Sequence, residues 1–393
     1  MKQPFLGRDT WAEIDLDAIT HNVHQFQKWI PKKTKILCAV KANAYGHGSV
    51  PVAKAVVEAG ADYLGVAFLD EALELRAAGI TASILVMGVT PPHAMERAIK
   101  EKITLSIPDE SYYLELEKIA SRLRQKVKYH LKVDTGMSRL GLKPQEVVPF
   151  LQKVAGSAFV ELEGLFTHYA TSDDRDKSYY ERQFRLFDEM VQQIKSSGFD
   201  IPLIHASNSA GAIEFPERSY DMIRMGISLY GFYPSQEVHQ TLSLRPAMSL
   251  HSKVGMIKQV PADVGISYGK IYQTTKEESI ATLPIGYADG ILRVLSNRGQ
   301  VLIKGKRVPI VGRVCMDQLM IQVDEAMPVS IGEEVVFYGK QGEEQISVEE
   351  VARWMGTIHY EVTCLLDWRV PRIYKKNGKI VDVVNHLLPA TSL

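Results

Sequence analysis

The stretch ILCAVKANAYGHGSV, residues 36–50, raises the first structural question about this chain. The apolar run from Ile36 to Val40 predicts a buried strand, because it is short, continuous and followed by turn-forming residues. Lys41 follows the run directly. A lysine at the end of a buried strand is either a solvated strand end or a reactive amine, and residues elsewhere in the chain have to distinguish the two.

Short apolar runs alternate with helix-period segments from about residue 34 to residue 235. Eight runs are predicted strands, at residues 35–40, 63–68, 83–88, 103–107, 128–133, 161–169, 203–207 and 222–231. Several of the intervening segments end on glycine, a common helix stop. Eight strand–helix units in roughly 200 residues predict a (β/α)8 TIM barrel. A doubly wound open sheet has the same alternation and stays open as the alternative.

The pattern changes near residue 245. From there on, the sequence has strands and turns with one clear helix, SVEEVARWMG at residues 347–356. Asn377-Gly378 is a pair that two-residue hairpins prefer. We therefore expect an α/β chain with a (β/α)8 barrel at residues 1–243 and a mostly β C-terminal domain at residues 244–393. Roughly the first 12 residues are candidates for pairing with the β domain.

Composition is that of an ordinary globular protein and excludes several classes of function. The 393 residues are 46% hydrophobic and 23% charged, and 46 basic side chains balance 46 acidic ones, so no nucleic-acid partner is expected. The cysteines, Cys38, Cys315 and Cys364, lack CxxC spacing, and the histidines lack metal-ligand spacing, so no metal is expected. With no apolar leader and no apolar run of about 18 residues, we expect a cytoplasmic protein without a membrane partner.

Polar side chains follow the predicted strands at their carboxyl ends, where (β/α)8 barrels carry their chemistry. They are Lys41 after strand one, Lys132 and Arg139 at strand five, His168 after strand six, Asn208 and Ser209 after strand seven, and Arg224 and Gly226 at strand eight. Small, glycine-bearing loops after strands seven and eight are typical phosphate sites. A lysine across the barrel mouth predicts a phosphorylated aldehyde held as a Schiff base, which is pyridoxal 5′-phosphate (PLP) on Lys41.

The motifs resemble those of the bacterial alanine racemases. AVKANAYGHG (39–48) is similar to the PLP-lysine motif of that family, and the similarity covers nearly the whole chain in the family's order. The further motifs are RDTWAEIDLDAI (8–19), VDTGMSRLG (133–141), GLFTHYATSD (164–173), NSAG (208–211), DMIRMGISLYG (221–231), SYGKIY (267–272), PIGYADG (284–290), VGRVCMDQ (311–318) and HYEVTC (359–364). The first motif fits several barrel-type PLP enzymes, whereas SYG, GYADG and GRVCMDQ together are far more specific.

The resemblance implies a role for each matching residue. Lys41 resembles the Schiff-base lysine, which is also one of two bases, and Tyr268 resembles the opposite base. Arg224 resembles the arginine that faces the pyridine nitrogen, and His168 the histidine that links Tyr268 to it. The positions that match cofactor contacts are Lys41, Tyr45, Arg139, His168, Asn208, Ser209, Arg224, Gly226, Ile227 and Tyr360. The positions that match substrate contacts are Arg139, Tyr287, Met316 and Asp317, and Lys132 matches a lysine that family members often carry as a carbamate.

The implied reaction explains why these residue types are needed. Racemisation removes the Cα proton from one face and returns a proton to the other, so two bases on opposite faces carry it out while PLP delocalises charge. A lysine or tyrosine has an ordinary pKa of about 10, so its surroundings must lower that pKa before it can act as a base near neutral pH. An arginine at the pyridine nitrogen disfavours a protonated ring and hence side reactions such as transamination. The resemblance also implies a head-to-tail homodimer in which the partner supplies Tyr268, while the sequence leaves a site within one chain open.

The leading hypothesis is an isomerase that interconverts L- and D-alanine and supplies D-alanine for peptidoglycan. A serine or broad-range racemase would keep the cofactor and change the pocket lining. A non-catalytic PLP carrier usually lacks the β domain, so residues 244–393 and Tyr268 argue against it. A barrel-type decarboxylase is expected to have an acid at the pyridine nitrogen, so Arg224 argues against it. His47 and His205 are expected to be structural.

Overall fold

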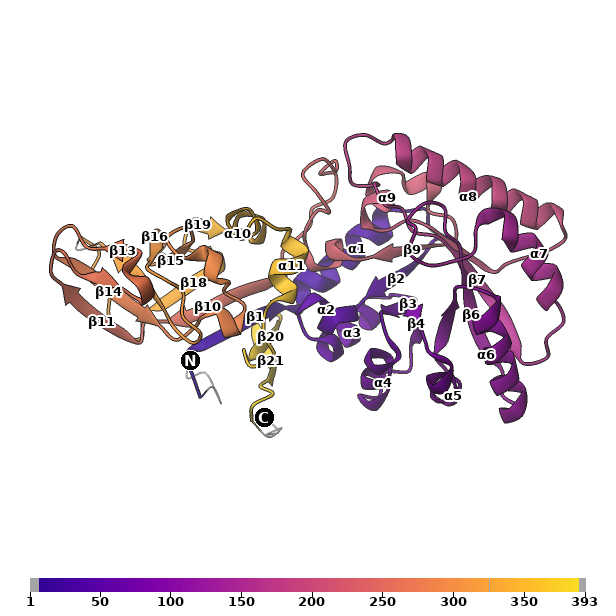
Figure 1. Cartoon of the computed structure of the whole chain (residues 1–393), viewed down its shortest axis with the longest axis horizontal. Helices are drawn as coiled ribbons and strands as arrows, with labels where there is room; N and C mark the ends of the chain where they lie inside the picture. The colour runs from indigo at the N-terminus through magenta and orange to yellow at the C-terminus, as the bar shows by residue number, and fades with distance from the viewer. Residues whose placement is uncertain (1–6, 325, 389–393) are drawn as a thin grey trace. The chain divides into compact units, whose positions relative to one another are not determined.

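The computed structural model describes residues 7–324 and 326–388, and this part of the chain divides into two compact units (Figure 1). The barrel unit consists of residues 18–44 and 49–246. The β unit consists of the described residues of 1–17, 45–48 and 247–393. The segment 45–48 therefore belongs to the β unit, although elements of the barrel unit precede and follow it in the chain.

The barrel unit is built on an eight-stranded parallel sheet. The strands are β2 (Lys35–Ala39), β3 (Tyr63–Val66), β4 (Ser83–Val89), β5 (Thr104–Ile107), β6 (Val127–Lys132), β7 (Val160–Phe166), β8 (Leu203–His205) and β9 (Met222–Met225). They pair in the order β8-β7-β6-β5-β4-β3-β2-β9. Backbone hydrogen bonds from Asp221 N to Ile204 O and from Arg224 N to Ser207 O, both 2.9 Å, join the two ends into a nearly closed barrel. The predicted (β/α)8 barrel is confirmed, and the open doubly wound sheet is wrong.

Helices connect the strands because the intervening sequence has the apolar period of an amphipathic helix. They are α1 (Leu16–Trp29), α3 (Ser49–Glu58), α4 (Leu69–Ala77), α5 (Pro92–Lys100), α6 (Glu110–Leu123), α7 (Pro144–Val154), α8 (Ser178–Ser196) and α9 (Ser209–Glu214), with the short turns α2 (Lys41–Tyr45), η1 (Pro216–Arg218) and η2 (Ile227–Tyr230). Figure 1 shows α4 to α8 on the outside of the strands. Within the unit, Leu37, Tyr63, Leu85, Leu203 and Met222 form one buried cluster. Side chains from five strands thus fill the barrel, which is a packed core and not a pore.

The β unit consists mainly of strands, as the sequence predicts. Its 11-stranded sheet contains β1 (Thr10–Asp15), β10 (Met248–Lys253), β11 (Met256–Val260), β14 (Glu278–Leu283), β15 (Gln300–Ile303), β16 (Lys306–Val311), β17 (Leu319–Val323), β18 (Glu334–Gln341), β19 (Glu344–Ile346), β20 (Arg372–Lys376) and β21 (Lys379–Val384). The remaining elements are the pair β12 (Gly265–Ile266) and β13 (Tyr272–Gln273), the helices α10 (Val348–Met355) and α11 (His359–Cys364), and the turns η3 (Tyr268–Lys270), η4 (Tyr287–Asp289) and η5 (Arg293–Leu295). Strand β1 pairs with β10 and β20. Among the described residues of both units, no helix combines the length and the apolar character needed to span a bilayer.

Two glycines of the segment 45–48 are required by contacts inside the β unit. Gly46 has φ +84°, and a Cβ there would collide with the carbonyl oxygen of Thr363. Gly48 has φ +98°, and a Cβ there would collide with the hydroxyl group of Tyr374. Backbone conformation and lack of space therefore both exclude a side chain at these positions.

Replacing Gly46 by alanine should lower the free energy of unfolding by about 2–4 kcal/mol, because it adds positive-φ strain and a steric conflict with the backbone. Gly79→Ala is the matched control, since Gly79 has φ +80° but a Cβ there would have no atom within 4 Å beyond its adjacent residues. The control should lose only about 1 kcal/mol. Urea unfolding followed by circular dichroism measures both variants. Equal losses would contradict the steric explanation.

Candidate active site

Lys41 stands where β2 ends and α2 begins, and α2 is a left-handed turn. The residues Ala42, Asn43, Ala44 and Tyr45 have φ values of 51°, 52°, 51° and 52°. Left-handed backbone costs roughly 1–2 kcal/mol per residue for L-amino acids, so four in a row need support from their surroundings. Such strain is concentrated at functional sites, and here it lies in the four residues that directly follow Lys41.

Two hydrogen bonds within the barrel unit support this turn. The backbone N–H of Ala42 donates to Oε1 of Glu71 at 2.6 Å, and the side-chain Oδ1 of Asn43 accepts from the backbone N–H of Ser49 at 2.8 Å. The other oxygen of Glu71 accepts from the backbone N–H of Ala67 at 2.7 Å. Glu71 therefore joins the turn after β2 to the turn after β3. This role was not predictable from the residue type, since an acidic residue in the first turn of a helix is ordinary.

Arg224, on β9, is 5% exposed and has four hydrogen-bond partners in the described part of the barrel unit. Its Nη2 donates to the carbonyls of Thr167 at 2.7 Å and Ala206 at 2.8 Å, and contacts Nδ1 of His168 at 3.1 Å. Its Nη1 contacts Nδ1 of His205 at 2.9 Å. Burial lowers the pKa of Arg224 to about 10, so it is still a cation at neutral pH. The link of His168 to Tyr268 that the resemblance implies stays a prediction, and the contact of Arg224 with His205 was not predicted.

The two histidines that contact Arg224 are neutral. Burial and the positive charge of Arg224 hold the pKa of His168 and that of His205 well below the ordinary value. Because a guanidinium can only donate, Nδ1 of each imidazole accepts, and the proton of each ring lies on Nε2. His168 therefore presents an N–H donor at Nε2.

Several cationic side chains of the barrel unit are close enough to His168 to change its pKa. The side chains that lower the pKa of His168, after its burial, are Arg224, Lys132, Arg139 and Lys41. Lys132 is itself buried, donates to the carbonyl of Val133 at 2.7 Å, and has its pKa lowered to about 7 by burial and by the charge of Arg224. A neutral amine is the form that reacts with carbon dioxide, so the environment of Lys132 suits a carbamate. The cluster as a whole favours an anionic ligand.

The loops after β8 and β9 meet at Ser209 and Gly226. The side-chain oxygen of Ser209 accepts from the backbone N–H of Gly226 at 2.9 Å. Ser209 begins α9 and Ile227 begins η2, and the first N–H groups of a helical turn have no partner inside that turn. Asn208 caps α9, because its Oδ1 accepts from the N–H of Gly211 at 2.9 Å. These small residues and backbone donors fit a phosphate group.

The other predicted residues belong to the β unit. They are Tyr45, Tyr268, Tyr287, Met316, Asp317 and Tyr360. The rings of Tyr45 and Tyr360, which both match cofactor contacts of the family, lie 6.3 Å apart between centroids. Tyr45 is 9% exposed, and burial raises the pKa of its hydroxyl. It is thus a neutral hydrogen-bonding group and not a phenolate.

Tyr268 and the CMD segment are tied together inside the β unit. Tyr268 is 71% exposed and follows Ser267, whose φ is +63°. The hydroxyl of Ser267 donates to the carbonyl of Arg313 at 2.8 Å and lies 3.4 Å from Sγ of Cys315. The backbone N–H of Tyr287 donates to the carbonyl of Cys315 at 2.9 Å. The turns that carry Tyr268, Tyr287 and the segment after Cys315 are therefore held as one group.

A buried carboxylate outside the predicted set supports the same group. Asp289 is fully buried, and its Oδ1 accepts from Nε of Arg369 at 2.7 Å and pairs with Arg8 at 2.8 Å. Arg369 also donates from Nη2 to Oδ1 of Asp317 at 2.6 Å. Asp289 could have been identified from the sequence because it lies in the GYADG motif, whereas Arg369 lies in none of the quoted motifs. Through these pairs, the position of Asp317 depends on a residue 52 positions further along the chain.

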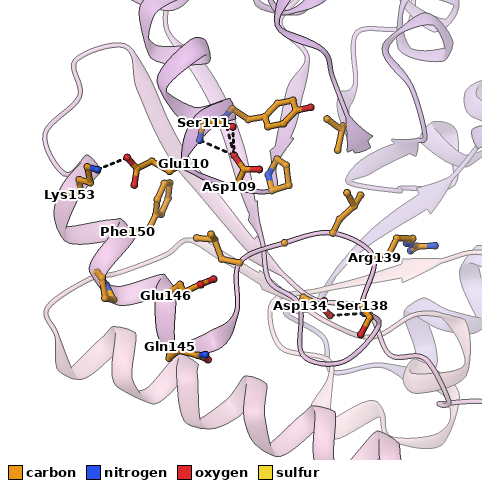
Figure 2. A pocket seen from close by; sticks show the side chains of 17 residues that line it. Asp109, Glu110, Ser111, Asp134, Ser138, Arg139, Gln145, Glu146, Phe150 and Lys153 are labelled. Atoms are coloured by element: carbon orange, nitrogen blue, oxygen red, sulfur yellow. Dashed lines mark hydrogen bonds and ion pairs between the residues drawn. The ribbon is translucent and has the colours of Figure 1, made fainter.

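A pocket of about 1150 Å³ lies elsewhere in the barrel unit (Figure 2). It lies between α6, α7 and the loop after β6, and Figure 2 shows Arg139 at its edge. In that loop, Oδ1 of Asp134 accepts from the backbone N–H of Ser138 at 2.9 Å. Neither Lys41 nor Arg224 lines the pocket. Of the predicted site residues, Arg139 is the one that lines this pocket.

Comparisons with known proteins match the chain over most of its length. The family model described as "Alanine racemase, N-terminal domain" matches residues 14–234, and "Alanine racemase, C-terminal domain" matches residues 247–374. "Alanine racemase 2" of Caldanaerobacter subterraneus subsp. tengcongensis is 46% identical over 384 residues, which are 97% of this chain and 98% of that protein.

Solved structures agree with these matches. The crystal structure of alanine racemase from Bacillus anthracis has a TM-score of 0.92 and 47% identity, and the match covers 98% of this chain and 99% of that one. Histidine racemase from Leuconostoc mesenteroides subsp. sake has a TM-score of 0.88 and 28% identity, over 95% of this chain and 99% of that one. The same architecture therefore also occurs in a racemase named for another amino acid.

The left-handed turn after Lys41 can be tested at Asn43. Asn43→Val should lower the free energy of unfolding by about 2–3 kcal/mol, because β-branched residues tolerate φ near +50° poorly and the hydrogen bond to Ser49 is lost. Asn43→Gly loses the same hydrogen bond but accepts the backbone conformation, so it should lose only about 1 kcal/mol. Urea unfolding compares the two. If the glycine variant is as unstable as the valine variant, the turn is not under backbone strain.

Proposed function

We propose that this chain, which belongs to the alanine racemase family, interconverts L- and D-alanine and supplies D-alanine for peptidoglycan. The observation that carries the proposal is the amine of Lys41, held by a strained turn at the end of a barrel strand in a positively charged site. The match to the family along both units supports the same activity. Alanine racemases are isomerases, and no other co-substrate is needed for the reaction.

The cofactor that we propose is pyridoxal 5′-phosphate, because the residues present fit its three functional groups. Lys41 offers the amine for the aldehyde, the backbone donors around Ser209 and Gly226 offer a phosphate site, and Arg224 offers a donor to the ring nitrogen. The hydrogen bonds of Arg224 with described residues involve Nη1 and Nη2, so a guanidinium with five N–H groups still has donors for a ligand. When bound, this cofactor supplies the electron sink that acidifies the Cα proton of an amino acid.

The residues of this chain would move the proton. We assign Lys41 as the base on one face of the substrate and Tyr268 as the base on the other. Arg139 and the backbone at Met316 would hold the substrate carboxylate, with Asp317 and Tyr287 beside them. Arg224 is a cation that can only donate, so it disfavours a second positive charge on the ring nitrogen and limits side reactions. An acid at that position, as in the decarboxylase alternative, would do the opposite.

The two bases that we propose belong to different units, Lys41 to the barrel unit and Tyr268 to the β unit. We propose that the partner in a head-to-tail homodimer supplies Tyr268. Its 71% exposure in the single chain leaves its side chain accessible to another chain. The presence of the β unit also argues against a non-catalytic PLP carrier. Location in the cytoplasm stays a prediction.

Chiral analysis of alanine tests the activity directly. Purified protein incubated with PLP and pure L-alanine should yield D-alanine, and the Lys41→Ala variant should yield none above background. If alanine stays pure L with the wild-type protein, alanine is not the substrate. Serine and histidine, tested in the same way, then distinguish a racemase of other specificity from a PLP carrier, which racemises none of them.

Subunit complementation tests the shared site. Lys41→Ala and Tyr268→Ala chains should each be inactive alone, but when unfolded, mixed and refolded together they should recover roughly a quarter of wild-type activity, because half of randomly paired dimers contain one intact site of two. Refolded wild-type protein is the control for yield. A mixture that stays inactive while the wild type recovers would assign both bases to the same chain.

A further inference from the structure

A continuous chain of buried side chains extends from Arg224 across the interior of the barrel unit. Nη1 of Arg224 lies 2.9 Å from Nδ1 of His205, and Nε2 of His205 lies 2.8 Å from Nδ1 of His130. Nε2 of His130 lies 3.3 Å from Oε2 of Glu163. Both histidines are 0% exposed and Glu163 is 6% exposed. Four strands, β9, β8, β6 and β7, each contribute one member.

The groups at the two ends of this hydrogen-bonded row determine which atom donates in each of its hydrogen bonds. Arg224 can only donate, so Nδ1 of His205 accepts and Nε2 of His205 carries the proton. That N–H donates to Nδ1 of His130, which therefore also has its proton on Nε2. The Nε2–H of His130 donates to the carboxylate of Glu163, which can only accept. Every proton is thus assigned by a guanidinium at one end and a carboxylate at the other.

Glu163 is built to remain an anion. Burial by itself would raise the pKa of Glu163, but hydrogen bonds from His130, Lys128 and Tyr63 outweigh burial and hold the pKa at about 2. Nζ of Lys128 lies 2.7 Å from Oε1, and the hydroxyl of Thr104 lies 3.5 Å from Oε2. Burial lowers the pKa of His130, so the imidazole between Glu163 and His205 is neutral. The last member of the hydrogen-bonded row, Glu163, therefore carries a negative charge.

The backbone makes room for this arrangement. The neighbour of Glu163, Gly164, lies against the ring of His130, and a Cβ at Gly164 would be 2.7 Å from ring atoms of that histidine. The ring of His205 stacks on Phe166 at 4.8 Å between centroids with an angle of 2°. Both imidazoles are thus confined by their neighbours, and a rotation of either ring would break the hydrogen bonds that join Arg224 to Glu163.

We propose that Glu163 and His130 are positioning residues, which act through His205 to hold the guanidinium of Arg224 in the orientation that its ligand requires. The inference rests on the proposed function, in which that ligand is the ring nitrogen of PLP. If Glu163 becomes glutamine, its amide can donate to His130, and both imidazoles can then exchange tautomers. Nδ1 of His205 would carry a proton and could no longer accept from Arg224.

The tautomers are measurable without any reaction. In wild-type protein labelled with ¹⁵N-histidine, with and without PLP, His130 and His205 should each give the signals of a neutral ring protonated on Nε2. Single His130→Asn and His205→Asn variants assign the signals. A ring protonated on Nδ1, or a cationic imidazole, at either position overturns the proposal. This result stands even if the protein fails to racemise alanine, so it separates the proposal from the proposed function.

Glu163→Gln is the decisive variant, and Glu161→Gln is its matched control. Glu161 lies on the same strand, β7, two residues earlier, but is exposed. With bound PLP, Glu163→Gln should change the absorption spectrum of the cofactor and lower kcat roughly tenfold, the size expected from one buried contact to a charged group, with little change in KM. Glu161→Gln should match the wild type in the spectrum, kcat and histidine signals. If the two variants behave alike, Glu163 has no positioning role.

Discussion

A buried cation without a buried counterion is the constraint on which the rest of the site depends. In the described part of the chain, the hydrogen-bond partners of Arg224 are two backbone carbonyls, of Thr167 and Ala206, and two imidazole nitrogens, of His168 and His205. Burying a charge is costly unless hydrogen bonds satisfy it. Every hydrogen-bond partner of Arg224 must therefore accept, and neutral histidines can do so without adding a negative charge.

The positive charge of Arg224 then determines the state of its neighbours. It helps to keep His168 and His205 neutral and lowers the pKa of Lys132 to about 7, after burial. A carboxylate beside Arg224 would reverse each of these effects by favouring protonated neighbours. Here the nearest carboxylate of the buried chain, Glu163, is separated from Arg224 by two imidazoles. The barrel thus keeps a donor-only cation at one end of the network and an anion at the other.

Much of the fold follows from local sequence, and the site follows only in part. The strand–helix alternation and the strand-end positions of Lys41 and Arg224 were predictable because period and position are local properties. The left-handed turn was not, since four residues without glycine, such as Ala42 and Ala44, give no signal of positive φ. The pairing of His130 with Glu163 depends on the register between β6 and β7, which shifts between Tyr129 and His130. Such a pairing has no trace in a single sequence.

The segment 36–50 is dense in unusual residues because two sets of requirements meet in it. The first half of the segment is stabilised by contacts in the barrel unit, where Glu71 and Ser49 form hydrogen bonds with the strained turn after Lys41. The second half is constrained by the β unit, where Gly46 lies so close to the carbonyl group of Thr363 that no side chain fits. Between them, the left-handed turn sets the direction in which the chain leaves the strand. Lys41 of the barrel unit and Gly46 of the β unit can therefore be only five positions apart, because hydrogen bonds and close contacts fix the backbone at both ends of the segment between them.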